Sequence, residues 1–420
     1  MLVYVINKHG QPLVPCDPRK ARLLLKEGKA KVIQRTPFTI QLLYGSSGYK
    51  QPISLGVDAG TKHIGVSATT EKHVVFEAEV LLRTDIQELL STRREFRHAR
   101  RHRKTRYRQP RFLNRRRSDG WLAPSVQNKM DAHVQVIKEV AKILPISSVT
   151  VEVAQFDIQK INNPDIAGTE YQEGDQMGFW NVREYVLFRD QHACQSCHGK
   201  TKDKILNVHH IESRKTGGNS PGNLITLCDT CHDKIHRESL THLFQRQRES
   251  FRDASQMTMM RWFIYRGVQK VFPDAKLTYG YLTKNTRITH GLEKNHRVDA
   301  RCISGNPNAY PAETTYLIKR VRGQNRQLHK ATFLKGGVRK ANKASRYVMG
   351  FQLFDKVRYN GHEGFVFGRR ASGYFDLRLL DGTRISAGVH CKKLTLLERA
   401  STLLIQTTKG GSSAPPRPER

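Results

Sequence analysis

Four of the seven cysteines in the chain occur as two closely spaced pairs. Cys194 and Cys197 are separated by two residues, and so are Cys228 and Cys231, with thirty residues between the pairs. Such pairs bring four thiolates within reach of one tetrahedral Zn²⁺ ion. Four protein ligands leave no open position for a substrate, so we expect a structural zinc. Two disulfides are the alternative, and the other three cysteines suit ordinary buried positions.

Histidines with metal-ligand spacing lie within and just after the segment from Cys194 to Cys231, which we call the cysteine frame. His209 and His210 are adjacent in an apolar segment, and side chains alternate along a strand, so the two rings must face opposite sides. One ring can then bind a metal while its neighbour faces a substrate. His232 and His236 are four residues apart, which places both on one face of a helix. We predict that a strand, a loop and a helix enclose one metal ion.

Acidic residues on apolar segments form a second candidate site outside the cysteine frame. Asp58 lies near the end of the first strand of a β-hairpin predicted over residues 53–68, and Glu152 lies on a valine-rich strand. His296 and Asp299 share one face of a short predicted helix. Burial of an unpaired carboxylate is unfavourable, which favours a functional role. Three carboxylates and a histidine are a suitable ligand set for two Mg²⁺ ions.

The charge of the chain indicates a polyanionic partner. The 420 residues include 72 Lys and Arg against 37 Asp and Glu, a formal net charge of +35. Residues 93–117 alone hold 13 basic residues and one acid. Nucleic acid is the expected partner, with a membrane surface as the second choice. We predict no membrane span and no secretory signal, and therefore a cytoplasmic protein. The prokaryotic source and the association with the nucleoid when bound to DNA are implied only by the family resemblance described below.

The histidine segment resembles the HNH nucleases of the ββα-metal type. The resemblance implies that His210 is the general base that deprotonates the attacking water and that Asn223 holds the catalytic loop. It also implies that His209 and His232, with His236, bind Mg²⁺, or Mn²⁺ in its place, at the scissile phosphate.

The order of the motifs resembles that of the split RuvC-like nucleases. An Asp-Ala-Gly hairpin, a strand with a glutamate, an HNH insertion and a His-x-x-Asp helix follow one another along the chain. The resemblance implies an RNase H-like fold whose site consists of Asp58, Glu152, His296 and Asp299, with Mg²⁺ as cofactor. The arginine-rich stretch resembles a bridge helix, whose residues would contact a guide RNA: Arg93, Arg94, Arg97, Arg100, Arg101, Arg103, Lys104, Arg106 and Arg108.

The N-terminus resembles that of the IscB proteins, which are transposon-encoded nucleases guided by an OMEGA RNA. Their N-terminal module is named after a Pro-Leu-Met-Pro motif, and residues 12–15 read Pro-Leu-Val-Pro. We therefore predict an α/β multidomain protein in which the RuvC-like fold is split by the bridge helix and the HNH domain. The expected segments are the N-terminal module (1–52), RuvC-like segment I (53–84), the bridge helix (85–120), RuvC-like segment II (121–180), the HNH domain (181–248), RuvC-like segment III (249–305), a β-rich C-terminal region that contacts RNA and the target-adjacent motif (306–410), and a disordered tail (411–420).

The resemblance implies an RNA-guided endonuclease that cuts double-stranded DNA as a monomeric ribonucleoprotein. The HNH site would cut the strand paired with the guide, and the RuvC-like site would cut the displaced strand. Two alternatives stay open. One is a protein-guided HNH endonuclease of the homing or restriction type, and the other is a catalytically silent nucleic-acid-binding protein associated with a transposon.

Overall fold

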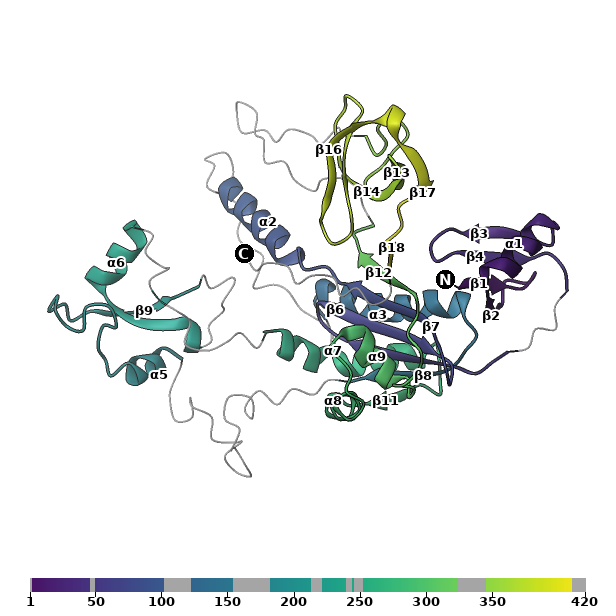
Figure 1. The fold of residues 1–420 in the computed structure, drawn as a ribbon. Helices are drawn as coiled ribbons and strands as arrows, with labels where there is room; N and C mark the ends of the chain where they lie inside the picture. Colours follow the sequence, from purple (N-terminus) through teal and green to yellow (C-terminus); the bar gives the residue numbers. More distant parts are fainter. Residues whose placement is uncertain are drawn as a thin grey trace. The chain divides into compact units, whose positions relative to one another are not determined.

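The structure is a computed structural model that describes residues 2–45, 50–101, 122–153, 182–212, 221–238, 244, 252–323 and 345–409. The chain divides into two compact units, which we call unit 1 (residues 1–155 and 259–420) and unit 2 (residues 156–258). The predicted mixed α/β class is confirmed, since the described residues form helices and four β-sheets (Figure 1). No helix in the described part of the chain is long and apolar enough to cross a membrane.

A seven-stranded mixed sheet forms the centre of unit 1. Its strand order is β11-β8-β5-β6-β7-β12-β18. The predicted hairpin is confirmed, because β5 pairs with β6 antiparallel and Asp58 lies opposite Gly65. Strand β8 runs parallel to β5, and β11 runs parallel to β8. The strands are β5 (Ile53–Ala59), β6 (His63–Thr69), β7 (Val74–Leu81), β8 (Ile146–Glu152), β11 (Lys276–Thr278), β12 (Thr314–Arg320) and β18 (Leu403–Lys409).

Strands β12 and β18 at one edge of this sheet come from residues 306–410, which were predicted to form a separate C-terminal region. Strand β12 pairs with β7 in parallel, and β18 pairs antiparallel with β12 along its full length. No local pattern in the sequence indicated these pairings. Residues 306–410 therefore supply two strands to the central sheet in addition to a sheet of their own.

Two glycines allow helix α9 (His296–Ile303) to pack directly on the central sheet. A Cβ atom at Gly65 would lie 1.8 Å from the His296 carbonyl oxygen, and one at Gly56 would lie 2.0 Å from that of Ala300. Only a residue without a side chain fits at either position. The close approach brings the start of α9 next to the end of β5, which carries Asp58.

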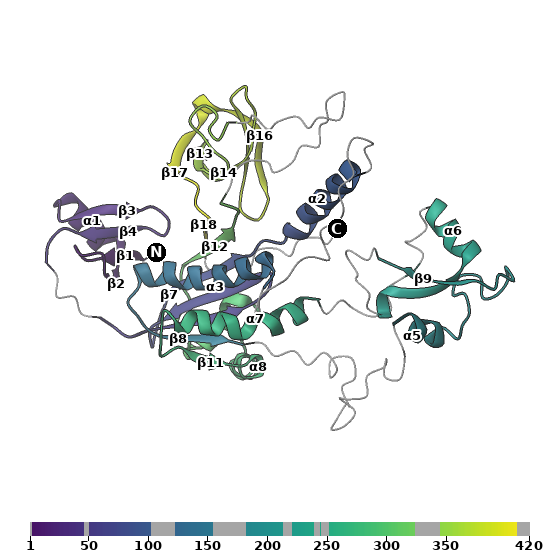
Figure 2. The same cartoon turned by 180° about the vertical axis from the view of Figure 1, so that it is seen from behind.

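Four further helices lie wholly or mainly in the part of the chain that forms unit 1. Helix α3 (Pro124–Ile143) and helix α7 (Arg252–Gln269) lie side by side in Figure 2, and a Cβ atom at Gly267 would come 2.9 Å from the Val134 side chain. Helix α8 (Gly280–Thr289) follows β11. Helix α2 (Ile86–Arg101) carries the beginning of the arginine-rich stretch.

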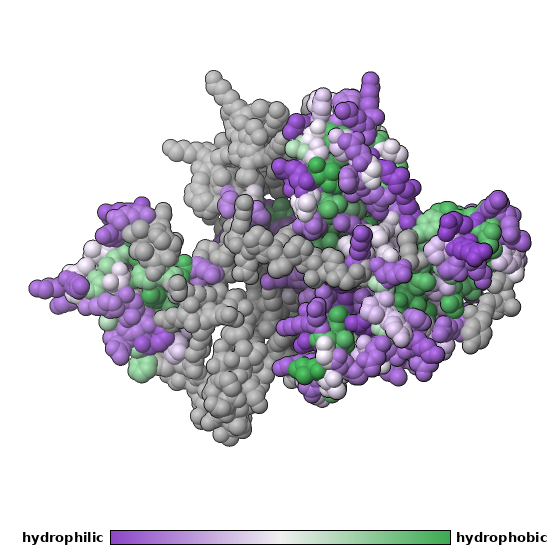
Figure 3. Space-filling view, in the orientation of Figure 1, coloured by the Kyte–Doolittle hydropathy of each residue, from purple (hydrophilic) through white to green (hydrophobic). Residues whose placement is uncertain are grey.

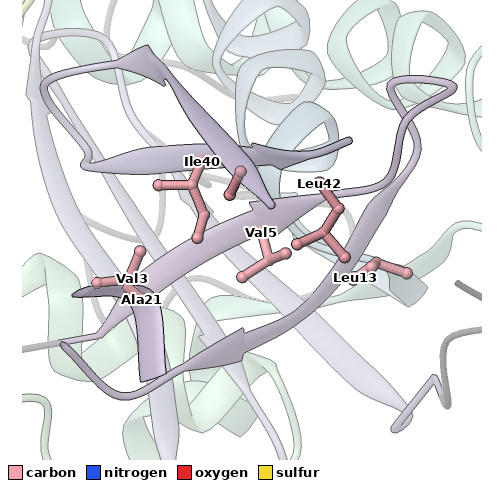
Figure 4. Packing of buried hydrophobic residues seen from close by; sticks show 7 residues of the cluster. Val3, Val5, Leu13, Ala21, Ile40 and Leu42 are labelled. Carbon is pink, nitrogen blue, oxygen red and sulfur yellow. The ribbon is translucent and has the colours of Figure 1, made fainter. Parts of the chain in front are cut away.

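The N-terminal sheet of unit 1 has its own small core, shown in Figure 4. Its strand order is β2-β1-β4-β3, with helix α1 (Pro18–Lys26) between β2 and β3. Asp17 caps α1, because its carboxylate accepts hydrogen bonds from the Arg19 and Lys20 amides. The strands are β1 (Val3–Ile6), β2 (Pro12–Cys16), β3 (Ala30–Gln34) and β4 (Thr39–Leu42). The core residues are Val3, Val5, Leu13, Ala21, Ala30, Ile40 and Leu42.

The C-terminal β-rich part forms a five-stranded antiparallel sheet of order β16-β15-β14-β13-β17. The predicted Asn360-Gly361 turn is confirmed, since both residues have a positive φ and Tyr359 pairs with His362. The strands are β13 (Lys356–Tyr359), β14 (His362–Arg369), β15 (Tyr374–Arg378), β16 (Arg384–His390) and β17 (Thr395–Glu398).

Unit 2 contains the cysteine and histidine motifs. Its described elements are α5 (Val182–Arg189), β9 (Leu206–His210), the 3₁₀ turn η2 (Pro221–Asn223), β10 (Leu224–Cys228) and α6 (Asp229–Glu238). Strands β9 and β10 form an antiparallel hairpin in which His210 lies opposite Leu224. The predicted strand through His209 and His210 and the predicted helix through His232 and His236 are both confirmed.

Candidate functional site

Three histidines of unit 2 converge from one strand and one helix. His209 of β9 and His232 and His236 of α6 each offer a ring nitrogen, and these atoms lie within 4.8 Å of one another. His209 is buried, and its ring meets the other two edge-on at centroid distances of 5.2 and 5.0 Å. We call this cluster, together with His210 and Asn223, the imidazole site. Three imidazole nitrogens at this spacing fit a divalent cation and leave coordination positions for water and phosphate.

The ring of His209 is poised to act as a neutral ligand. Burial, followed by the charges of His236 and His232, lowers the pKa of His209 to about 4. Protonation of one ring would place a positive charge beside two other rings, which is unfavourable in a buried position. His209 is therefore unprotonated at neutral pH, the state in which imidazole binds metals.

Asn223 fixes the loop that follows His210. Its side chain is fully buried, its Oδ1 accepts a hydrogen bond from the Glu212 amide at 2.9 Å, and its Nδ2 donates to the Glu212 carbonyl at 3.0 Å. The Ile211 amide also donates to the Asn223 carbonyl oxygen at 2.9 Å. His210 directly precedes this loop and is only partly buried, whereas His209 is buried. The two rings thus differ in exposure as the strand alternation predicted.

The four cysteines of unit 2 form a second cluster. Their Sγ atoms lie within 4.8 Å of one another, and Cys194, Cys228 and Cys231 are part of the hydrophobic core of the unit. Hydrogen bonds from Thr201 lower the pKa of Cys197 to about 5, while burial raises that of Cys231. Four thiols in one core fit a structural Zn²⁺, because the cation favours the thiolate form that burial alone opposes.

Arg189 and Asp190 hold the strand and turn that carry Asn223, and sequence reasoning missed both. Asp190 is buried, and its carboxylate accepts a hydrogen bond from the Thr226 amide at 2.8 Å and pairs with the Arg189 guanidinium at 2.7 Å. Arg189 also donates to the carbonyl oxygens of Pro221 at 2.8 Å and Leu224 at 2.9 Å. An arginine that ends an ordinary helix and is followed by an aspartate gives no signal that would single out either residue.

The acidic candidates of unit 1 meet at the junction of the central sheet and α9. The His296 Nδ1 atom lies 2.6 Å from Asp58 Oδ2, although the two residues are 238 positions apart in the chain. The hydrogen bond with Asp58 raises the pKa of His296. His63 stacks on His296 with an interplanar angle of 7° and pairs with Glu79 at 2.8 Å. Sequence reasoning missed His63 and Glu79, which fix the orientation of the His296 ring.

Glu152 and Asp299 complete what we call the carboxylate site, defined by Asp58, Glu152, His296 and Asp299. Burial, followed by the charge of Asp58, raises the pKa of Glu152 to about 7 and also raises that of Asp299. The carboxylates therefore repel one another in a partly buried position. Carboxylate oxygens are the ligands that a hard divalent cation prefers, and such a cation would neutralise this repulsion. Among the described residues, however, only the two clusters of unit 2 have three or more candidate ligand atoms within 4.8 Å of one another.

Helix α8 supplies two further residues to the carboxylate site that sequence reasoning also missed. The Thr283 hydroxyl donates to Glu152 Oε2 at 2.5 Å, and Arg287 Nε lies 3.1 Å from Asp299 Oδ1. Thr283 and Arg287 are four residues apart and so share one face of the helix. The four-residue spacing indicates that the two side chains lie on the same face of the helix. Only the tertiary structure shows that this face contacts Glu152 and Asp299.

The basic residues predicted to bind RNA lie on or beyond helix α2. Arg93 and Arg94 are exposed on α2. Arg97, Arg100 and Arg101 also lie on its backbone, with their side chains outside the described part of the structure. The remaining members of the predicted set fall outside the described residues: Arg103, Lys104, Arg106 and Arg108. The predicted tail, residues 411–420, lies outside them as well.

Comparison with known families gives the class of the protein. Residues 194–238 match the HNH endonuclease family, a range that contains both the cysteine cluster and the imidazole site. The chain thus carries an HNH endonuclease domain, which supports a DNA nuclease. Residues 3–174 match the RRXRR protein family, which is found in nucleases of the IscB kind. The two matches together support an HNH nuclease of that kind. No curated protein matches the chain.

Proposed function

We propose that the protein is an RNA-guided endonuclease that cuts both strands of DNA with two separate metal-dependent sites. The observation that supports the proposal is that one chain carries two differently built clusters of candidate metal ligands, the imidazole site of unit 2 and the carboxylate site of unit 1. A nuclease that cuts the two strands of an opened duplex at two separate sites would require both the imidazole site and the carboxylate site. One chain then suffices, and the active particle is a monomeric ribonucleoprotein.

Within the HNH domain, His210 accepts the proton of the attacking water, and Asn223 keeps the loop after His210 in place. His209, His232 and His236 would hold Mg²⁺, which stabilises the charge that develops on the phosphate and the leaving oxygen. The neutral state of His209 at physiological pH supports this role, because no proton has to leave before the cation binds. We assign the guide-paired strand to this site.

The order of the central sheet supports an RNase H-like, RuvC-type assignment for unit 1. Five of its strands lie in the spatial order β7-β6-β5-β8-β11, which is 3-2-1-4-5 when they are numbered along the chain from β5. Strands β5, β6 and β7 pair antiparallel with one another in turn. Strand β8 pairs parallel with β5, and β11 pairs parallel with β8. Asp58, Glu152, Asp299 and His296 would hold Mg²⁺ at the displaced strand. Thr283, Arg287 and His63 keep three of these ligands in position.

RNA guidance rests on charge and on the RRXRR match. The 13 basic residues between positions 93 and 117 suit a phosphate backbone. Helix α2 carries Arg93 and Arg94 exposed, as contact with an external polyanion requires. In such an enzyme base pairing with the guide selects the target, and the protein reads only a short adjacent motif.

The test is to purify the protein after co-expression with its flanking genomic DNA and to sequence the nucleic acid that copurifies. A discrete RNA with one constant structured end and one variable end is expected. The variable end then supplies a duplex target for cleavage assays with Mg²⁺, in which each strand carries its own label. Recovery of heterogeneous RNA or of DNA alone would instead favour a protein-guided HNH endonuclease. Absence of any cleavage would favour a silent nucleic-acid-binding protein.

A further inference from the structure

Two exposed tyrosines lie side by side at the start of helix α8. The Tyr279 residue is 37% exposed and Tyr281 is 63% exposed. Their rings are nearly parallel, with an interplanar angle of 13° and centroids 6.1 Å apart. Neighbouring apolar side chains are exposed too, since Leu282 is 44% and Ile288 60% exposed, and Figure 3 shows hydrophobic residues at the surface in the region of this helix. We call Tyr279 and Tyr281 the tyrosine pair.

The glycine between the two tyrosines lies close to the carboxylate site. Gly280 separates the two tyrosines, and a Cβ atom there would lie 3.0 Å from Glu152 Oε1. The Tyr279 carbonyl oxygen accepts hydrogen bonds from the amides of Leu282 and Thr283, so it begins the helix whose Thr283 hydroxyl donates to Glu152. The tyrosine pair is therefore fixed at the edge of the carboxylate site rather than on a free loop.

Exposed, nearly parallel aromatic rings beside the carboxylate site suit a ligand with flat aromatic groups, such as single-stranded nucleic acid. The π-faces of unpaired nucleobases stack on tyrosine with little dependence on sequence, whereas the bases of a duplex are already stacked and paired. Exposed Lys284 lies on α8 and exposed Lys294 follows the helix in the chain, and both carry the positive charge that phosphates attract. A site that must accept strands of any sequence but reject intact duplex needs such a contact.

We propose that the tyrosine pair is a base-stacking subsite for single-stranded DNA, which holds a nucleotide next to the phosphate at the carboxylate site. The inference rests on the proposed function, in that the strand held there is the displaced one. Stacking on the pair selects an unpaired strand and sets its distance from Asp58, Glu152 and Asp299. The tyrosines bind and position the strand and take no part in proton transfer.

A binding assay tests the subsite independently of cleavage. The purified protein with its bound RNA is mixed, with Ca²⁺ in place of Mg²⁺ to prevent hydrolysis, with a single-stranded DNA oligonucleotide that carries 2-aminopurine. Stacking on a ring quenches this fluorophore. We compare the wild-type protein with the double variants Tyr279→Leu/Tyr281→Leu and Tyr279→Phe/Tyr281→Phe, and with Tyr310→Leu as control, because Tyr310 is 68% exposed but far from α8 in the sequence.

The wild-type, phenylalanine and Tyr310→Leu proteins should quench the fluorophore, and the leucine double variant should bind about tenfold more weakly without quenching. In cleavage of a DNA duplex with a pre-opened bubble, the same variant should raise the KM for the displaced strand about tenfold and leave kcat and the guide-paired strand unchanged. Unchanged binding and quenching in a folded leucine variant would overturn the subsite. The subsite and the proposed function can also fail separately. If the leucine variant lost quenching but the wild-type protein did not cut the displaced strand, the subsite would be supported. The assignment of displaced-strand cutting to the carboxylate site would then be wrong.

Discussion

The residues of the imidazole site lie close together in the sequence, whereas those of the carboxylate site come from distant segments of the chain. The imidazole site uses one hairpin and the helix directly after it, all within unit 2. The carboxylate site joins β5, β8 and α9, and its contact between Asp58 and His296 spans 238 positions. The first site therefore depends on local structure and its cysteine cluster, whereas the second requires the whole central sheet of unit 1.

The two sites also differ in electrostatics. Burial and neighbouring imidazoles lower the pKa of His209 to about 4, which leaves that ligand free of protons at neutral pH. Burial and neighbouring carboxylates raise the pKa of Glu152 to about 7, so this ligand still carries a proton for part of the time at neutral pH. A metal ion that binds at the carboxylate site would compete with a proton, whereas one that binds at His209 would not. Variants that affect only one site should reveal this difference.

The largest effect is expected from loss of a cysteine ligand. Cys228→Ser removes one of four thiols from the core of unit 2, and binding of structural zinc contributes on the order of 10 kcal/mol to the folding of small zinc domains. We expect zinc content to fall from about one ion per chain to none, with loss of the guide-paired-strand cut. Elemental analysis and strand-specific cleavage measure both. Cys16→Ser, outside the cluster, should keep zinc, and retention of zinc by Cys228→Ser would disprove the four-cysteine site.

Removal of the key residue of one site should produce a strand-specific nickase. His210→Ala should slow the guide-paired-strand cut by about 10²–10⁴-fold and leave the displaced-strand cut intact. Asp58→Ala should do the reverse, because the carboxylate site loses a metal ligand. Cleavage of a duplex with a different label on each strand distinguishes the two cuts.

Matched controls for these nickases are available in each unit. His192→Asn suits unit 2, because His192 is exposed and has a positive φ that asparagine tolerates. Asp274→Asn changes an exposed acid of unit 1. Both controls should cut both strands at the wild-type rate. If His210→Ala or Asp58→Ala abolished both cuts, or neither, the assignment of one strand to each site would be wrong.

A smaller effect is expected at Asn223, which acts on the imidazole site through the backbone. Asn223→Ala leaves the amide and carbonyl of Glu212 without their partner in a buried loop, at a cost of about 1–3 kcal/mol. We expect the guide-paired-strand cut to slow by about tenfold or more while zinc is retained. Asn207→Ala, which removes an exposed contact to Asp229, is the matched control. An equal effect of the two variants would refute the positioning role.

The smallest effect concerns pH. Deprotonation of Glu152 is favoured as pH rises through about 7, so metal affinity at the carboxylate site should increase in the same direction. Between pH 6 and pH 8 the Mg²⁺ concentration for half-maximal cutting of the displaced strand should fall by about tenfold. The guide-paired strand should show a weaker dependence, because His209 is neutral over this range. Magnesium titrations of the two nickases at each pH provide the measurement, and equal shifts would contradict the electrostatic difference.

Local patterns were sufficient to predict the elements that carry the sites. Alternating apolar residues predicted the hairpin with Asp58, and the spacing of His232 and His236 predicted helix α6. These predictions succeeded because strand and helix periodicity depend on neighbouring residues. The two-residue spacing within each cysteine pair likewise predicted a cluster that the structure places in the core of unit 2.

Contacts between distant segments could not be predicted in the same way. Thr283 and Arg287 look like ordinary helix residues until α8 is placed beside Glu152 and Asp299. Arg189 and Asp190 gain their role only where α5 meets β10. The pairing of β12 with β7 was also missed, because either edge of a sheet accepts many apolar strands and no local pattern selects one.

The sequence by itself thus determined the residue types of the candidate ligands, the strands and helices that carry them, and the positive charge that favours a polyanionic partner. Tertiary structure alone decided which acids lie together, how far their pKa values shift, and which neutral side chains hold them. The physical reason is that periodicity and turn chemistry act over a few residues, whereas burial and charge interactions depend on distances in space. The proximity of Gly280 to Glu152, which places the tyrosine pair beside the carboxylate site, exists only in the folded chain.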